Sequence, residues 1–332
     1  MNNTTFVYGS EVQGRGYATD MDIAFGIVTT LIGITACTGG VLNLYLIKNL
    51  KAFHNAFGFF WVVRTIGELG TDLTFLLYTG PVTVLQPTNI PPALGIFVYH
   101  LSYTFAYMQC LMNLIIAWNR FVAVWFPMNY LRVFNAKLCG GVAIYVCCQA
   151  CIVTTLFFIF PCNQVGYGPR FYANVFVKCD PSIDRDYSIL STLLCKVCFT
   201  IACVGTGVVN MTTFCKIVYI RVTSQARSTS KEYKRDVRLF FLGVVQDILM
   251  TIVLLSIILC NNQKDLGLLS IVLSYDGLIL IYCFNTGSMV LCNPECRRFL
   301  FGTRKGAVSN TYATGTGAAS NTAAPSDTKH ED

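Results

Sequence analysis

Three ionisable side chains, Arg64, Glu68 and Asp72, follow one another at four-residue spacing within an apolar stretch of the sequence. Side chains four residues apart lie on one face of a helix, so Arg64 can pair with Glu68. Inside a bilayer each such group costs about 2.5–3.5 kcal/mol, and these residues are therefore functional candidates. Two interpretations stay open: a central polar or sodium site around Glu68, and a structural network between helices. Arg64 can already neutralise the charge of Glu68, which argues against a sodium site.

A second candidate is Arg120, in the triplet Asn119-Arg120-Phe121 that closes another apolar run. A guanidinium at the mouth of a helix bundle can pair internally or meet a partner protein. The alternative is an interfacial arginine that extends to lipid phosphate. Asn119 cannot supply a carboxylate, and Asp236 begins a later apolar run at the same predicted depth. We therefore predict a contact between Arg120 and Asp236.

The sequence offers little for enzyme chemistry. Its three histidines, His54, His100 and His330, are dispersed, which excludes a histidine-rich metal site. The last apolar run, 266–291, contains no lysine that could form a retinal Schiff base. We expect no enzyme activity, no cofactor and no metal.

The elements that position these residues are apolar segments. Mean hydropathy is +0.55, 54% of residues are hydrophobic and only 12% are charged, far from the average of soluble domains. A membrane-spanning helix needs about 20 mostly apolar residues, and the sequence supplies seven such segments. The predicted fold is an all-α integral membrane protein, a seven-transmembrane helix bundle over 24–302 with a short amphipathic eighth helix. The predicted spans are Ala24–Lys48, Ala56–Thr79, Ala93–Val124, Leu138–Phe160, Ser188–Tyr219, Val237–Cys260 and Leu266–Leu291.

Charge sets the predicted topology. The net charge of +7 gathers at the ends of alternate apolar segments, where it indicates the cytoplasmic side of a bilayer and not nucleic-acid binding. Residues 1–23 are then extracellular, with glycosylation sequons at Asn2 and Asn3. Residues 303–332 form a cytoplasmic tail that is poor in large apolar residues, and we expect it to be disordered.

Several short motifs carry a family resemblance. Asn119-Arg120-Phe121 resembles the aspartate-arginine-tyrosine motif of rhodopsin-like receptors, followed at the usual spacing by Pro127. In chain order with it stand Gly39–Asn43, Phe57-Gly58, Asn210–Lys216, Asp236–Phe240, Gln246-Asp247, Asp276-Gly277, Phe284-Asn285 and Asn293–Phe299. From the first span to the eighth helix, the sequence resembles a nematode serpentine chemoreceptor of the Srx class.

The resemblance implies a G-protein-coupled chemosensory receptor in the plasma membrane of a sensory neuron, in its cilium. Such a receptor binds a small odorant- or pheromone-like ligand and activates a heterotrimeric G protein. The implied switch for G-protein coupling is Asn119, Arg120, Phe121 and Asp236. The implied central polar network consists of Asn43, Arg64, Glu68, Asp72, Asp247 and Asn285.

The resemblance also places a ligand pocket in the outer half of the bundle. Its candidates are Tyr99, Ser102, Tyr103, Ala106, Tyr107 and Lys196; for each aromatic residue the alternative is helix packing. Ser102 occupies the position at which amine receptors place an aspartate, so we do not expect a biogenic amine. Lys196 can pair with an acidic ligand or extend to the headgroups.

The cysteines of one outer loop complete the expectations. The third span begins without the cysteine that usually bridges to this loop, so we predict a disulfide within the loop, between Cys162 and Cys179, with Cys260 as the second candidate partner.

A polytopic transporter or channel that uses Arg64, Glu68, Asp72, Asp247 and Asp276 is the competing interpretation. It has no internal repeat in its favour.

Overall fold

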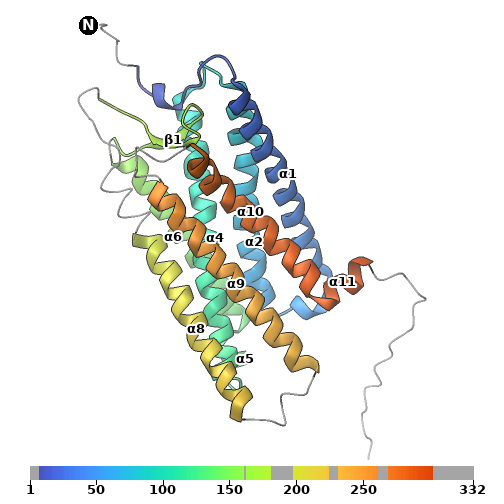
Figure 1. The fold of residues 1–332 in the computed structure, drawn as a ribbon. Helices are drawn as coiled ribbons and strands as arrows, with labels where there is room; N and C mark the ends of the chain where they lie inside the picture. The colour runs from blue at the N-terminus through green and yellow to red at the C-terminus, as the bar shows by residue number, and fades with distance from the viewer. Residues whose placement is uncertain (1–6, 161, 181–196, 224–230, 261–267, 302–332) are drawn as a thin grey trace, which may run out of the picture.

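The computed structural model describes residues 7–160, 162–180, 197–223, 231–260 and 268–301, and of these it describes 221–222, 231–239, 258–260 and 268–275 by their backbone alone (Figure 1). Long helices run roughly parallel to one another through the molecule. They are α1 (Asp20–Asn49), α2 (Ala56–Thr74) continued by η3 (Phe75–Thr79) and α3 (Gly80–Leu85), α4 (Pro92–Trp125), α6 (Ala136–Ile159), α8 (Phe199–Thr223), α9 (Lys231–Cys260) and α10 (Leu268–Cys292). These agree with the predicted spans in order and approximate position, but the second helix continues beyond Thr79 to Leu85 and α9 begins at Lys231, before Val237. The predicted start of the seventh span, at Leu266, lies outside the described residues. The predicted start of the fifth span, at Ser188, lies outside the described residues.

Shorter elements mark the two ends of the bundle. The antiparallel hairpin of β1 (Val165–Gly168) and β2 (Ala173–Phe176), with η1 (Ser10–Val12) beside it, lies at one end, called here the hairpin end. At the other, the α11 end, lie α11 (Pro294–Phe301), η2 (Lys51–Phe53) and α5 (Tyr130–Val133) (Figure 1). The chain bends by 84° between α10 and α11, which agrees with the predicted eighth helix.

Polar residues at the helix starts fix where the helices begin. The Thr19 hydroxyl accepts the backbone N–H of Asp22, and the Asp22 carboxylate accepts that of Thr19, a capping box for α1. Asn55 and Asn135 cap α2 and α6 in the same manner, each accepting from the backbone N–H three residues on. The sequence thus sets the helix starts locally, before any packing.

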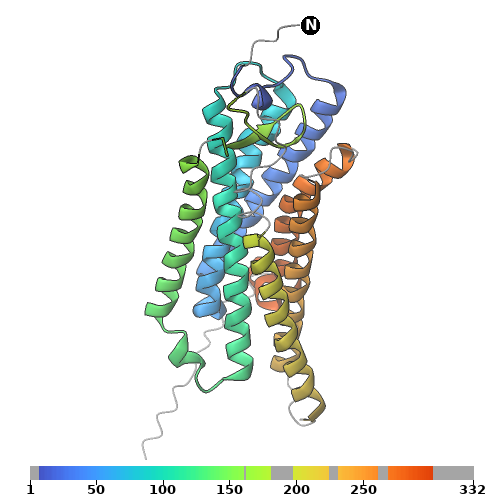
Figure 2. The ribbon, with the colours of Figure 1, turned by 90° about the vertical axis from the view of Figure 1, so that its left-hand side faces the viewer.

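Six of the described helices, α4 among them, form a closed ring. Contacts run from α1 to α2, α2 to α4, α4 to α8, α8 to α9, α9 to α10 and α10 back to α1, while α6 packs on the outer side of α4 (Figure 2). A core of Phe60, Met112, Ile116, Phe157 and Tyr282 fills the centre. Side chains from α2, α4, α9 and α10 therefore meet inside the bundle.

The bundle buries polar side chains and exposes apolar ones. Arg64, Gln109 and Asn210 are at most 2% exposed, whereas Leu31 and Ile144 are more than half exposed. A soluble helix bundle has the reverse arrangement. Four of the described helices are long and apolar enough to cross a membrane, α1, α6, α8 and α9, and α10 with α11 makes a fifth if that bent pair is one span. The central α2 falls short because it holds Arg64, Glu68 and Asp72.

A polar cap covers the hairpin end, and its hub is the fully buried Asp22. The Asp22 carboxylate accepts from Arg15 at 3.0 Å, from the Gln86 amide at 2.8 Å and from the Tyr172 hydroxyl. Arg170 of the hairpin donates to the carbonyl of Gly14. The N-terminal segment, the turn after α3 and the hairpin are thereby interlocked.

The loop that carries the hairpin holds a disulfide between Cys162 and Cys179, with 5.4 Å between the two Cα atoms. This is the pairing expected within that loop, and the side chain of Cys260 lies outside the described residues. The hairpin itself was not predicted from the sequence, because its two strands have only four residues each.

Candidate functional site

Arg120 forms a buried ion pair toward the α11 end of the bundle. Its Nη1 lies 3.5 Å from Oδ2 of Asp247, and the two side chains are 10% and 6% exposed. The amide of Asn210 donates to the same carboxylate oxygen at 2.7 Å. The carboxylate of Asp247 thus joins α9 to both α4 and α8. We call Arg120, Asp247 and Asn210 the latch.

Gly243, one turn before Asp247 on α9, makes room for the latch. A Cβ atom at this position would lie 2.3 Å from Nη2 of Arg120 and 2.6 Å from its Cζ. Only glycine therefore lets the guanidinium lie flat against α9 in this position. Sequence reasoning missed this residue, although a glycine one turn before a buried aspartate on an apolar helix was a readable signal.

The neighbours of Arg120 have other contacts. Asn119 exchanges hydrogen bonds of 3.2 and 3.3 Å with the hydroxyl of Tyr130 in α5. The ring of Phe121 stacks on that of Trp125 at 5.5 Å. The side chain of Asp236 lies outside the described residues, so its contact with Arg120 stays a prediction. The described carboxylate partner of Arg120 is Asp247, which the sequence analysis had placed in the central network.

A second buried ion pair lies within α2. Arg64 contacts Oε1 of Glu68 through Nη2 at 3.0 Å and Nε at 3.1 Å, and both side chains are at most 3% exposed. The amide of Asn285 on α10 donates to the same oxygen at 3.0 Å. The structure thus brings together three of the residues predicted for the central network.

The other predicted network members lie nearby with different partners. Asn43 donates to Thr65 at 3.1 Å and not to Glu68. Asp72 is buried, and its Oδ1 has no hydrogen-bond partner among the described residues. Gln246, which was not predicted as part of the network, donates to Ser288 at 2.6 Å and to the carbonyl of Asn285 at 3.3 Å. The hydrogen-bonded path through Glu68 and Asn285 therefore reaches α9.

The predicted ligand-pocket residues of α4 form an aromatic column. Tyr103 and Tyr107 stack at 6.2 Å between ring centroids, and both rings meet Phe199 of α8 edge-on, at 5.6 and 5.3 Å. Tyr99 lies next to Tyr103 at 6.2 Å. Ala106 is buried and Ser102 half-buried, and Lys196 lies outside the described residues. In this state the rings pack against one another.

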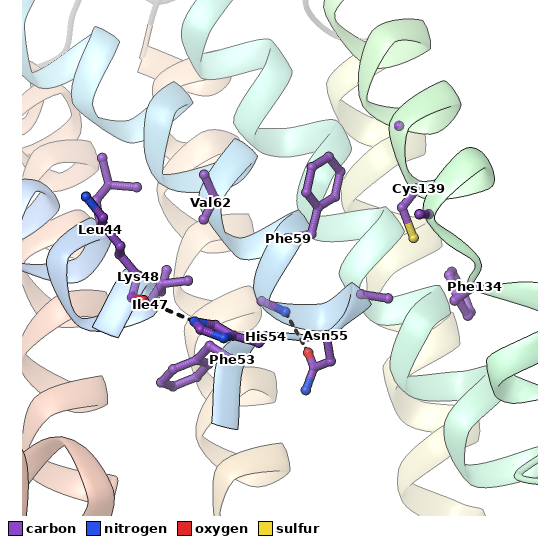
Figure 3. A pocket seen from close by; sticks show the side chains of 14 residues that line it. Leu44, Ile47, Lys48, Phe53, His54, Asn55, Phe59, Val62, Phe134 and Cys139 are labelled. Carbon is purple, nitrogen blue, oxygen red and sulfur yellow. Dashed lines mark hydrogen bonds between the residues drawn. The ribbon is translucent and has the colours of Figure 1, made fainter. Parts of the chain in front are cut away.

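A groove lies toward the α11 end, between the end of α1 and the starts of α2 and α6 (Figure 3). It has a volume of about 780 Å³ and is lined by apolar side chains such as Leu44, Phe59 and Val62. His54 closes one side through a 3.0 Å contact with the carbonyl of Lys48. Because Phe59 is 41% exposed on the outer face of α2, the groove opens away from the bundle centre. It is separate from the predicted pocket.

Asp276, which the transporter interpretation grouped with Asp247, lies far from the latch. It sits roughly two turns inside α10 from the hairpin end, and its carboxylate accepts a hydrogen bond from Thr29 of α1. The two aspartates thus occupy opposite halves of the bundle.

Comparison with known proteins agrees with the fold of the helix bundle. Residues 27–293 match the model of the family described as serpentine type 7TM GPCR chemoreceptor Srx. Among solved structures, the crystal structure of squid rhodopsin is similar, with a TM-score of 0.67 and 14% sequence identity over 91% of each chain. The search of curated proteins found no match.

Proposed function

Because this chain belongs to the Srx family of serpentine seven-transmembrane G-protein-coupled chemoreceptors, we propose that it is a chemosensory receptor for a small odorant- or pheromone-like molecule. The ligand binds in the hairpin-end half of the bundle. A heterotrimeric G protein is activated at the α11 end. The protein lies in the plasma membrane of a sensory neuron, with the hairpin end and the glycosylated Asn2 and Asn3 outside.

The latch is the observation that carries this proposal. It joins α4, α8 and α9 through one carboxylate at 3.5 and 2.7 Å. A guanidinium buried toward the α11 end is costly without a partner, so Asp247 favours the state in which the three helices are close together. A G protein that binds the released Arg120 would favour the open state.

The ligand acts on this balance from the other half of the bundle. A ligand can shift an equilibrium between two conformations only by its difference in affinity for them. The aromatic column on α4 supports such a difference, because Tyr103 and Tyr107 both pack on Phe199 of α8. A ligand that separates these rings also changes the position of α8, which carries Asn210 of the latch.

The test compares latch variants at matched surface expression. Arg120→Ala should abolish G-protein activation while surface expression is retained, and Asp247→Asn should raise basal activation without any ligand. Arg132→Ala is the matched control, because Arg132 is an exposed arginine of α5 at the same end. Activation is read with a reporter G protein, first without ligand and then with volatile and pheromone-like pools.

Normal activation by Arg120→Ala would refute the receptor mechanism and favour the transporter interpretation. An equal loss in Arg132→Ala would show that charge at this end, and not the latch, is what matters. The predicted contact of Asp236 is tested in parallel, since Asp236→Ala should also raise basal activation if it contributes.

A further inference from the structure

Asp276 is a buried carboxylate with no positively charged partner among the residues that the structure describes. It is 5% exposed, and its two oxygens lie 2.9 and 3.1 Å from the single hydroxyl of Thr29. Of the four other buried carboxylates of the described chain, Asp22, Glu68 and Asp247 each contact an arginine, whereas Asp72 does not. Within the described residues no such contact exists for Asp276. Burying an ionised carboxylate that has only one hydrogen bond costs free energy, so a cation bound beside Asp276 would stabilise it.

A small cavity adjoins this carboxylate. It has a volume of about 10 Å³, which is room for about one water-sized group. Besides Asp276, its walls are the aromatic rings of Phe25, Phe75, Tyr167 and Tyr172 and the hydroxyl-bearing Thr29, Thr79 and Thr83. The faces of aromatic rings attract cations. The described part of the wall therefore combines one negative charge, four rings and three threonine hydroxyls.

The backbone of η3 gives a second, independent indication. Phe75–Thr79 form a π-helical turn between α2 and α3, and the first and last residues of this turn, Phe75 and Thr79, both line the cavity. Single π-helical turns within α-helices are frequent at functional sites, because the extra residue redirects the side chains. The cavity is thus formed where α2 departs from regular geometry.

We infer that the cavity beside Asp276 is a binding site for the ammonium ion. An ammonium group has the size of a water molecule, donates hydrogen bonds to carboxylate and hydroxyl oxygens, and binds to aromatic faces. A sodium ion prefers a shell of oxygen ligands, which four rings do not supply. The inference rests on the proposed function in so far as it names the class of ligand.

This site differs from the amine site that the sequence argued against. Ser102 on α4 removes the carboxylate at the usual position of amine receptors, whereas Asp276 offers one from α10. The cavity has no room for the ring of an aromatic biogenic amine. The same limit of size excludes an alkyl chain, so the ligand is the ammonium ion.

The test measures binding without signalling. The purified full-length protein in lipid nanodiscs is heated at constant pH and ionic strength in sodium, ammonium, methylammonium or tetramethylammonium chloride. The unfolding midpoint Tm should rise with ammonium relative to sodium, and methylammonium, whose methyl group exceeds the cavity, should give a smaller rise. Tetramethylammonium, which is too large and donates no hydrogen bond, should give no rise.

Two variants locate the effect. Asp276→Asn keeps the shape of the side chain and should weaken the apparent affinity for ammonium by roughly tenfold or more. Thr79→Ile fills the cavity, leaves the carboxylate intact and should also remove the rise in Tm, so the test does not depend on one variant folding. The control is Glu295→Gln, which also replaces a carboxylate by an amide but lies at the α11 end. Its Tm should respond to ammonium as that of the wild type does.

Three outcomes would overturn the inference: equal Tm values in sodium and ammonium, a wild-type response in a folded Asp276→Asn protein, or a wild-type response in Thr79→Ile. Reporter activation is measured separately. Binding without activation would contradict the proposed coupling and leave the site intact. Activation by another ligand, without ammonium binding, would support the proposed coupling and contradict the ammonium site.

Discussion

The two arginine–carboxylate pairs inside the bundle differ in what they connect. Arg64 and Glu68 lie four residues apart on one helix and approach to 3.0 Å. Arg120 and Asp247 lie on α4 and α9 and approach to 3.5 Å. A pair within one helix keeps its geometry when helices move, whereas a pair between helices breaks. Burial alone therefore does not identify a switch; the elements that a charge pair joins decide whether it can open.

The largest effect is expected from breaking the local pair. Glu68→Ala leaves the guanidinium of Arg64 buried without a carboxylate, which should cost about 3–5 kcal/mol of stability. Surface expression should fall sharply, as measured by labelling of intact cells. Adding Arg64→Leu removes the unpaired charge and should restore part of the loss. Equal surface levels for wild type and Glu68→Ala would show that this pair contributes nothing to folding.

A smaller effect on stability, with a large effect on signalling, is expected at Gly243. Gly243→Ala places a Cβ against the guanidinium of Arg120, and overpacking of this kind costs about 1–3 kcal/mol. If the cost falls on the latched state, basal activation should rise by roughly fivefold or more.

The matched control for this variant is Gly207→Ala on α8, where an added Cβ meets nothing within 4 Å. Basal activation of this control should equal that of wild type. A Gly243→Ala protein that is expressed normally and shows unchanged basal activation would mean that Arg120 and Asp247 do not hold the resting state.

The smallest effect is expected at the third pair, in the cap. Arg15 is 29% exposed, so its contact with Asp22 is screened by solvent, and Arg15→Ala should cost less than about 1 kcal/mol. Asp22 keeps its bonds to Gln86 and Tyr172. Thermal unfolding of the purified protein measures the cost. A loss as large as that of Glu68→Ala would contradict the ranking of the pairs by burial.

The pH dependence of this cap variant sharpens the comparison. Burial, together with the hydrogen bond to Asp22, raises the pKa of Tyr172 above its ordinary value. The stabilisation by its hydroxyl is present below the ordinary pKa and is lost only as the pH rises through the raised value. The Tm of Arg15→Ala should therefore stay constant from about pH 7 to pH 9.

The features predicted correctly from the sequence are those that depend on residues close together in the chain. The predicted ends of the spans lie close to the helix ends, because apolar runs and capping residues such as Asn55 act over a few residues. The contact of Arg64 with Glu68 follows from four-residue spacing. The partner of Arg120 did not follow, since hydropathy gives only the depth of Asp236 and Asp247, and the position of the guanidinium depends on the space left by Gly243. The isolation of Asp276 depends on five segments that meet only in the folded chain.

The π-helical turn at Phe75–Thr79 has a consequence for how relatives of this protein can diverge. Such a turn holds one residue more than a regular helical turn, so deleting a single residue there would restore a continuous α-helix. Everything after it, up to Leu85, would then rotate by about 100° relative to α2. Thr83, which faces the ammonium cavity, and Gln86, which binds Asp22, would leave their places together. One codon gained or lost could therefore remodel the cavity and the cap in a single evolutionary step, while the latch at the other end stayed unchanged.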